Sequence, residues 1–403
     1  MRLRSLCCAL ICCVSFCLPA AAAPSVSAVS AILVDVDSGR VLYQNNAQEQ
    51  RLIASITKLM TALVAVEASP DLQEPVKIAY EWTLAEGSSI YLRQGETLKL
   101  ETLLYGLLLQ SGNDAALAIA GHCAGDVDTF VDWMNQRAAD LGMTRTHFAN
   151  PNGLNDERHY STAGDMAKLA RACLQNPQIA EIVATRSISM EGRTFTNHNK
   201  LLWQYKGCIG MKTGYTQMAG RTLVTAAQRD EQRLAVVTLC DPNDWEDHKA
   251  LFDYGFETYP RQVFCQAGQQ MGRIPVEGSL VRSVSVAAEE ELAYPLKEGE
   301  QVEERIVLPQ SVEAPVEKGE IAGEVVYTLE GKEVGRSYLL YESTVHQDSV
   351  AASRGIRWML DLFKARETGG VTAVLAQCFS TILNSPSNGT IPLPYNQLPT
   401  IGK

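Results

Sequence analysis

The sequence predicts an α+β domain, in which helices pack on a largely antiparallel sheet, followed by a small all-β sandwich domain. Strand-like runs flank a helical middle between residues 29 and 258. Over 260–345, short β-type runs alternate with Gly- and Pro-bearing turns. This stretch has 15 Glu, no Asp and 8 Lys plus Arg, so its composition departs from that of the preceding residues. We therefore expect a first domain over 24–258 and an all-β domain over 259–345.

Local patterns predict the elements of the first domain. Residues 29–44 predict a hairpin with its turn at Asp37-Ser38-Gly39. Helical spacing of apolar residues dominates over 55–175, and Thr162 and Asp165 form a capping pair at one helix start. Three strand-like runs follow, the last two joined as a hairpin, and then a helix pattern: CIGMKTGYT, GRTLVTAAQ, RLAVVTLC and DWEDHKALFDYGF.

The N-terminal residues predict export. Arg2 and Arg4 precede a short apolar stretch and the small residues of PAAAA, which is the pattern of a secretory signal peptide over 1–23. The apolar stretch is short for a membrane span. We expect the protein to work outside the cytoplasm, in the cell envelope.

The C-terminal residues 346–403 form a tail with two expected parts. Residues 352–366 carry one apolar stripe, which predicts either an amphipathic helix on the outer face of the cytoplasmic membrane or a helix packed on the β domain. The Pro- and Asn-rich end from Asn384 is expected to be disordered.

Charge, cysteine and histidine usage exclude several classes of protein. The net charge is −11, which argues against nucleic-acid binding because that needs a basic face. The histidines form no H-E-x-x-H or paired metal spacing, so we predict no zinc and no cofactor. Six cysteines follow the signal peptide without a C-x-x-C pair, and we favour buried thiols over disulfides: Cys123, Cys173, Cys208, Cys240, Cys265 and Cys378.

Three short motifs place polar and charged side chains where catalysis would use them. Ser55 and Lys58 lie three residues apart at the start of an apolar helix pattern, on one helix face. Ser111-Gly112-Asn113 falls on a break between helices, and Lys212-Thr213-Gly214 falls in a strand-like run. Singly, each has an ordinary interpretation: a helix cap with a solvated lysine, a polar turn and an exposed edge strand. A serine at a helix N-terminus with a neutral lysine beside it is also a nucleophile with its base.

Taken together, the motifs resemble those of the active-site serine penicillin-binding proteins and serine β-lactamases. They occur in the order S-x-x-K, S-x-N, K-T-G, with 56 residues from Ser55 to Ser111 and 101 from Ser111 to Lys212. The middle motif S-G-N and five flanking stretches are similar to the low-molecular-mass D-alanyl-D-alanine carboxypeptidases: GSSIYLRQGE, YGLLLQSGNDAA, FANPNGLND, HYSTAGDMAKLAR and GMKTGYTQMAGRTLV. The resemblance covers about residues 27–258 and implies a β-lactamase/transpeptidase-like fold.

The resemblance also implies a role for each motif residue. Ser55 would attack the carbonyl of the penultimate D-alanine of a peptidoglycan stem peptide, and Lys58 would be its general base. Ser111 would relay a proton to the leaving D-alanine, and Asn113 would orient Lys58 or hold the substrate amide.

The third motif would bind the substrate. Lys212 and Thr213 would hold the terminal carboxylate, and Gly214 would let the substrate approach the backbone. The backbone N–H groups of Ser55 and Tyr215 would form the oxyanion hole, and β-lactams would acylate Ser55 as covalent inhibitors. Lys212 would also help to keep Lys58 neutral, because two lysines in one cleft repel each other when charged.

Three alternative functions remain open at this point. A β-lactamase would need an additional carboxylate base for deacylation, and no E-x-x-L-N stretch lies between Ser111 and Lys212. A DD-endopeptidase would use the same motifs on cross-links. A catalytically inactive peptidoglycan-binding scaffold would not need them all. The family's further carboxylate-binding arginine is not assigned, although Arg221 is near the third motif, and Cys208 either lines the cleft or is buried.

Overall fold

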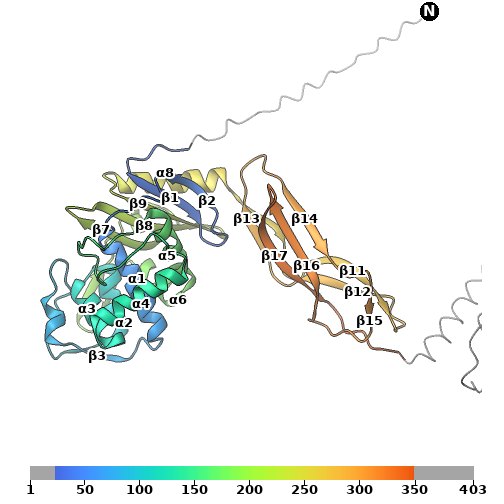
Figure 1. The fold of residues 1–403 in the computed structure, drawn as a ribbon, viewed down its shortest axis with the longest axis horizontal. Helices are drawn as coiled ribbons and strands as arrows, with labels where there is room; N and C mark the ends of the chain where they lie inside the picture. The colour runs from blue at the N-terminus through green and yellow to red at the C-terminus, as the bar shows by residue number, and fades with distance from the viewer. Residues whose placement is uncertain (1–22, 349–403) are drawn as a thin grey trace, which may run out of the picture. The chain divides into compact units, whose positions relative to one another are not determined.

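The structure is a computed structural model that describes residues 23–348 (Figure 1). These residues divide into two compact units. The first runs to Phe264 and includes Ala293–Val302 and Leu329–Val334, and the second holds the remaining described residues. The predicted signal peptide, the tail helix at 352–366 and Cys378 lie outside the described residues, and the domain boundary at 258/259 stays a prediction. Within 23–348, no helix combines the length and apolar character that a membrane crossing requires.

A five-stranded antiparallel sheet is the framework of the first unit. Its strand order is β2-β1-β9-β8-β7, so the strands of this sheet that come first and last in the sequence, β1 and β9, lie side by side. The strands are β1 (Ser30–Asp35), β2 (Val41–Asn45), β7 (Cys208–Thr216), β8 (Gly220–Arg229) and β9 (Gln232–Leu239). The predicted antiparallel sheet is confirmed, and β7 is an edge strand.

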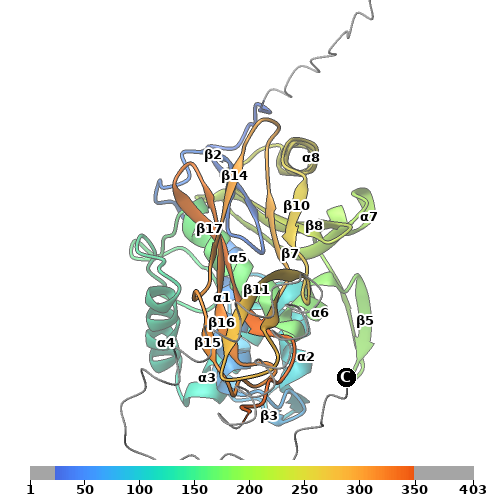
Figure 2. The ribbon, with the colours of Figure 1, turned by 90° about the vertical axis from the view of Figure 1, so that its right-hand side faces the viewer.

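Helices cover both faces of this sheet (Figures 1 and 2). Helix α8 (Asp244–Thr258) packs on one face, where Leu33, Val236 and Phe252 share a buried apolar cluster. The other face meets a larger cluster that includes Ile32 and Val237. Its helices and turn are η1 (Ala54–Thr57), α1 (Lys58–Ala68), α2 (Leu100–Leu109), α3 (Asn113–Ala124), α4 (Val127–Asp140), α5 (Ala163–Gln175) and α6 (Pro177–Ala184).

Short elements complete the first unit. Two small hairpins connect the helices, and one more helical turn precedes β7. These elements are β3 (Pro75–Lys77), η2 (Tyr80–Leu84), β4 (Thr97–Lys99), β5 (Ser187–Met190), β6 (Arg193–Thr196) and α7 (Leu201–Gln204).

Most local expectations for the first unit are confirmed, with one correction. β1 and β2 form the expected hairpin, and the Oγ1 of Thr162 accepts from the N–H of Asp165 at the start of α5. The helix expected to begin at Ser55 begins at Lys58 instead, because Ser55 lies in the 3₁₀ turn η1. No side-chain cap stabilises either start, so the cap interpretation of Ser55 is wrong.

The second unit is built from strands, as predicted. Its six-stranded sheet has the order β14-β16-β17-β12-β11-β15. The strands β10 and β13 form a separate pair, and most of their residues belong to the first unit. Buried Val286, Val325 and Leu339 line its apolar interior. The strands are β10 (Arg261–Cys265), β11 (Gln270–Glu277), β12 (Ser283–Ala288), β13 (Leu292–Pro295), β14 (Val302–Val307), β15 (Val312–Glu313), β16 (Ile321–Leu329) and β17 (Lys332–Tyr341). The five cysteines among the described residues are free thiols, and Cys173 and Cys265 are buried.

Candidate active site

The Ser55–Lys58 pair lies where the η1 turn becomes helix α1. Lys58 Nζ is 3.0 Å from Ser55 Oγ, as the three-residue spacing predicts. Helix α1 is buried along most of its length, so Lys58 cannot reach water and is 0% exposed. The alternative in which Lys58 is a solvated charge is therefore wrong.

Burial gives Lys58 the properties of a base. Desolvation lowers the pKa of Lys58 well below its usual range, and the nearby charge of Lys212 lowers this pKa further. Asp114 acts in the opposite direction but is the weakest of the three influences. Lys212 thus lowers the pKa of Lys58, which is the direction that the sequence predicted.

The hydrogen bonds of Lys58 orient its lone pair. The side-chain Oδ1 of Asn113 lies 2.7 Å from Nζ, and the backbone carbonyl of Asn152 lies 2.5 Å from it. The Asn152 oxygen is a carbonyl and can only accept. The oxygen of the Asn113 amide faces Lys58, because the Nδ2 group of Asn113 donates to the carbonyl of Glu86. Nζ lies within hydrogen-bond distance of Ser55 Oγ as well, at 3.0 Å. In a neutral amine the two N–H groups would occupy the two oxygen acceptors, and the lone pair would then face the hydroxyl of Ser55.

The Ser111-Gly112-Asn113 segment links α2 to α3, at the predicted break. Ser111 has a φ of +61°, which turns the chain between the helices, and Asn113 opens α3. The neighbouring carboxylate of Asp114 accepts from the backbone N–H groups of Ile90 and Leu92. These bonds hold the 88–92 loop beside the start of α3.

Strand β7 carries the third motif directly past Ser55. A Cβ added to Gly214 would lie 2.9 Å from the Ser55 nitrogen and 2.4 Å from Thr222 Oγ1, so only glycine permits this approach. Lys212 is 1% exposed, and burial lowers its pKa to about 7. Its Nζ donates to the carbonyl of Thr213 at 2.7 Å.

A cleft of about 510 Å³ collects the predicted residues. Five of them line it: Ser55, Ser111, Thr213, Gly214 and Tyr215. Lys58, Asn113 and Lys212 are buried, and Lys58 reaches the cleft through its contact with Ser55. Residues separated by more than 150 positions thus form one site.

Sequence reasoning missed other residues that line this cleft. Arg221 is opposite Tyr215 in the β7–β8 register, and its guanidinium binds Asp244 at 2.9 Å and lies 5.5 Å from the Trp245 ring centroid. The pairing of β7 with β8 could have indicated Arg221, because it is opposite Tyr215. The other missed residues lie in loops or at the start of α8, where no local sequence pattern indicates a cleft. The missed lining residues are Ser88, His198, Lys200, Arg221, Asp244 and Trp245.

Cys208 does not line the cleft. A β-bulge between Cys208 and Gly210 shifts the register of β7, so the simple alternation counted back from Lys212 fails. Cys208 is half-buried against the apolar cluster beneath α8.

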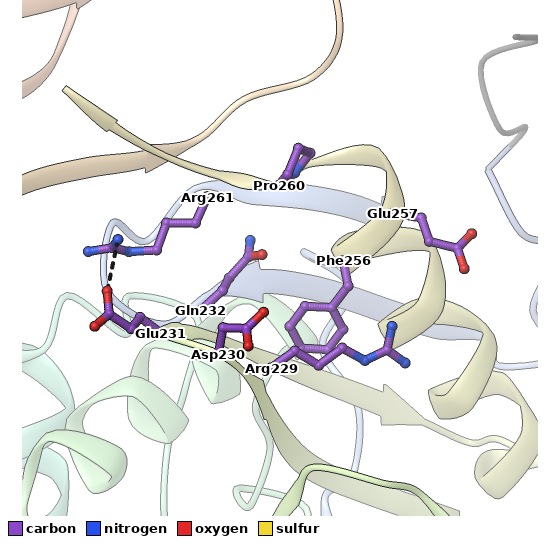
Figure 3. A pocket seen from close by; sticks show the side chains of 8 residues that line it. All are labelled: Arg229, Asp230, Glu231, Gln232, Phe256, Glu257, Pro260 and Arg261. Atoms are coloured by element: carbon purple, nitrogen blue, oxygen red, sulfur yellow. Dashed lines mark hydrogen bonds and ion pairs between the residues drawn. The ribbon is translucent and has the colours of Figure 1, made fainter.

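A second hollow, of about 430 Å³, lies at the β8–β9 turn and the end of α8 (Figure 3). Its two arginines are ion-paired: Arg229 with Asp253 at 2.5 Å, and Arg261 with Glu231 at 3.3 Å. Phe256 lies beside Arg229, with 4.6 Å from the guanidinium carbon to the ring centroid. None of the predicted catalytic residues lines this hollow, so the chemistry belongs to the first cleft.

Comparisons with known proteins agree with the geometry of that cleft. Residues 19–243 match the family model of D-alanyl-D-alanine carboxypeptidase, and residues 259–347 match that of the penicillin-binding protein 5 C-terminal domain. The chain is 30% identical to D-alanyl-D-alanine carboxypeptidase DacF of Bacillus subtilis over 325 residues, covering 77% of this chain and 84% of DacF. It is 32% identical to DacA of Escherichia coli K12 over 328 residues, covering 76% and 81%.

Solved structures give the same result. Penicillin-binding protein 5 of Haemophilus influenzae has a TM-score of 0.68 at 29% identity, over 81% of this chain and 100% of that one. A peptidoglycan synthesis regulatory factor (PBP3) of Streptococcus pneumoniae has a TM-score of 0.72 at 26% identity, over 80% and 100%. The chain therefore belongs to the D-alanyl-D-alanine carboxypeptidase family of serine-type, penicillin-binding hydrolases.

Proposed function

We propose that Ser55 is the nucleophile that removes the terminal D-alanine from peptidoglycan stem peptides through an acyl-enzyme. One observation carries the proposal: the buried Lys58 Nζ is 3.0 Å from Ser55 Oγ and also contacts the oxygens of Asn113 and Asn152. With its two N–H groups on those oxygens, the neutral amine has its lone pair free for the Ser55 proton. The lysine takes the hydroxyl proton as Ser55 Oγ bonds to the penultimate D-alanine carbonyl carbon. The C–N bond then breaks, D-alanine leaves with a proton, and water hydrolyses the ester.

The remaining roles follow from position in the cleft. Thr213 offers its hydroxyl to the terminal carboxylate, and the charge of Lys212 behind it attracts that carboxylate. The Ser55 and Tyr215 N–H groups stabilise the oxyanion, with Gly214 allowing close contact between β7 and the Ser55 turn. Ser111 relays the proton to the leaving amine.

The cellular setting is part of the proposal. The 1–23 signal peptide directs the chain out of the cytoplasm, where peptidoglycan stem peptides and β-lactams are available and where trimming affects cell-wall biogenesis and cell shape. The 24–258 domain carries the chemistry, and the all-β 259–345 domain follows it in the chain. The tail, through 352–366, makes peripheral contact with the outer face of the cytoplasmic membrane.

The geometry favours a carboxypeptidase over a β-lactamase. The group that the 149–153 segment presents to Lys58 is the backbone carbonyl of Asn152. A carbonyl cannot accept a proton from water as a carboxylate can, so this contact gives no base for rapid deacylation of a penicilloyl ester.

One paired assay tests the proposal. The purified protein and Ser55→Ala are incubated with fluorescent penicillin and, separately, with a peptide that ends in D-Ala-D-Ala. We expect stable labelling and D-alanine release from the native protein and neither from the variant. Rapid penicillin turnover without peptide cleavage would show a β-lactamase. A third incubation, with a cross-linked stem-peptide dimer, tests the endopeptidase: cleavage of the dimer without D-alanine release from the linear peptide would show one. No reaction with any of these would leave the binding scaffold.

A further inference from the structure

The residue before the nucleophile has an unusual backbone conformation. Ala54 has a φ of +48° and is 2% exposed. An L-residue with a side chain adopts this left-handed region at a cost of about 1–2 kcal/mol. Because the Ala54–Ser55 peptide sets the direction of the Ser55 N–H, the surroundings that hold Ala54 also hold the nucleophile.

Two contacts hold the Ala54 carbonyl. The hydroxyl of Thr57 donates to this oxygen at 2.8 Å inside the protein. Gly153 packs against the same group so closely that an added Cβ would lie 2.0 Å from the oxygen and 3.0 Å from the Ser55 nitrogen. The hydroxyl of Thr57 is therefore a side-chain donor to this carbonyl, in addition to the backbone bonds of the η1 turn, and Gly153 packs against the carbonyl from another side.

A buried histidine determines which way the Thr57 hydroxyl points. Nε2 of His159 is 2.8 Å from Thr57 Oγ1, and Nδ1 of His159 accepts from the backbone N–H of Ala149 at 3.1 Å. An Nδ1 that accepts has no hydrogen, so the neutral ring carries its hydrogen on Nε2. Nε2–H therefore donates to Thr57, and the single hydroxyl hydrogen of Thr57 goes to Ala54.

The surroundings of His159 keep the ring neutral. It is 1% exposed and lies edge-on to Phe148, with ring centroids 5.8 Å apart. Burial lowers the pKa of His159 to about 4, the charges of His147 and Lys58 lower it too, and Asp156 acts in the opposite direction. A second ring hydrogen would face the Ala149 N–H, so protonation would remove the hydrogen bond that Nδ1 accepts.

We propose that His159 and Thr57 are positioning residues, which fix the Ala54 peptide and through it the Ser55 hydroxyl and N–H in reacting geometry. Neither residue touches the substrate or lines the cleft. The inference rests on the proposed role of Ser55. It assigns a catalytic function to two buried polar residues that the hydrolytic steps do not use.

A matched pair of variants tests the hydrogen-bond chain from His159 through Thr57 to Ala54. Thr57→Val keeps the shape of the side chain but removes the hydroxyl, and Thr57→Ser keeps the hydroxyl. We expect Thr57→Val to lower the acylation rate by fluorescent penicillin about 10- to 100-fold, less than the loss of an oxyanion-hole donor. The concentration for half-maximal acylation should be unchanged, since the cleft wall is intact. Thr57→Ser should acylate within about threefold of the native protein.

The outcomes separate the two proposals. Native protein that does not label, or Ser55→Ala that does, would refute the role of Ser55. If the native protein is labelled and Thr57→Val is labelled equally fast, the positioning role of His159 and Thr57 would be overturned, and the role of Ser55 would stand. A general loss of packing would slow both Thr57 variants, and this result would also overturn it.

A measurement on the native protein does not depend on the variants folding. Nitrogen NMR of ¹⁵N-histidine-labelled protein reports which ring nitrogen carries the hydrogen. We expect a neutral His159 with its hydrogen on Nε2, unchanged across neutral pH. A hydrogen on Nδ1 would leave Thr57 as the donor to His159, so the Ala54 carbonyl would lose its side-chain donor, and this result would overturn the proposal.

Discussion

At the scale of single residues, the site depends on an ammonium group placed where it cannot stay charged. Lys58 is 0% exposed and forms no ion pair with a carboxylate of residues 23–348, so burial itself favours the neutral amine. Its two oxygen acceptors then decide where the remaining lone pair points. Burial lowers the pKa of Lys58, and its hydrogen bonds set the orientation of the amine toward Ser55.

Lys58→Ala tests the base directly. We expect penicillin acylation to slow by at least about 10³-fold, because the members of a catalytic unit fail together. Stopped-flow or gel-based labelling against time measures the rate, and Asn113→Ala offers a comparison in which the amine stays but loses one acceptor. An acylation rate equal to that of the native protein would exclude Lys58 as the base.

The two lysines predict a bell-shaped pH profile. Acylation needs neutral Lys58, whose pKa is lowered, so kcat/KM for a peptide with a free carboxylate rises with pH as Lys58 loses its proton. Carboxylate binding needs charged Lys212, whose pKa burial lowers to about 7, so kcat/KM falls again above about pH 7. A series of kcat/KM values from pH 5 to about 10 measures both limbs.

Lys212→Arg is the control for the alkaline limb. A guanidinium stays charged throughout this range, so the fall above about pH 7 should disappear while the acid limb remains. An alkaline limb that persists unchanged in Lys212→Arg would assign it to another group.

At the scale of elements, the cleft exists because an edge strand passes very close to a helical turn. Strand β7 has a neighbour on one side only, and Gly214 lets it touch the Ser55 turn. The hydroxyl of Thr222 on β8 donates to the carbonyl of Ile53 at 2.9 Å, which ties the sheet to the same turn. The sheet thus holds the nucleophile turn as well as the substrate strand.

Gly214→Ala tests this close approach. Its methyl group would push β7 away from Ser55, and we expect acylation to fall about 10- to 100-fold, since small displacements in a catalytic site are costly. Gly335→Ala is a matched strand control, because its added Cβ would meet nothing nearer than 3.6 Å. Equal acylation rates in the two variants would show that β7 can move away from Ser55 without slowing acylation.

At the scale of the whole molecule, the two units divide chemistry from attachment in the proposed function. The catalytic cleft draws all its lining residues from the first unit. The second unit extends to the end of the described chain, where Val316 and Val345 still pair and Asp348 binds Leu280. Removal of the tail should therefore begin after Asp348.

Truncation after Asp348 tests the tail. We expect the shortened protein to leave the membrane fraction, because the apolar stripe at 352–366 would be lost, while its penicillin labelling stays within about twofold of the full chain. Fractionation with labelling of each fraction measures both. Continued membrane association of the truncated protein would contradict the predicted anchor.

Local patterns in the sequence determined much of this protein. The hairpin at 29–44, the Thr162 cap and the strands β7, β8 and β9 follow from periodicity and turn residues, which act between near neighbours. The order and spacing of the three motifs predicted that their residues gather at one cleft, because that combination is rare even though each motif is common.

Only the tertiary structure decided how those residues act. The burial of Lys58, the Asn152 carbonyl beside it and the His159–Thr57 chain behind Ala54 join segments about 100 residues apart. Local sequence patterns also did not predict the bulge at Cys208 or the Arg221–Asp244 ion pair at the cleft. The physical reason is that side-chain pKa values and hydrogen-bond directions depend on which distant atoms exclude water, and a sequence pattern records near neighbours only.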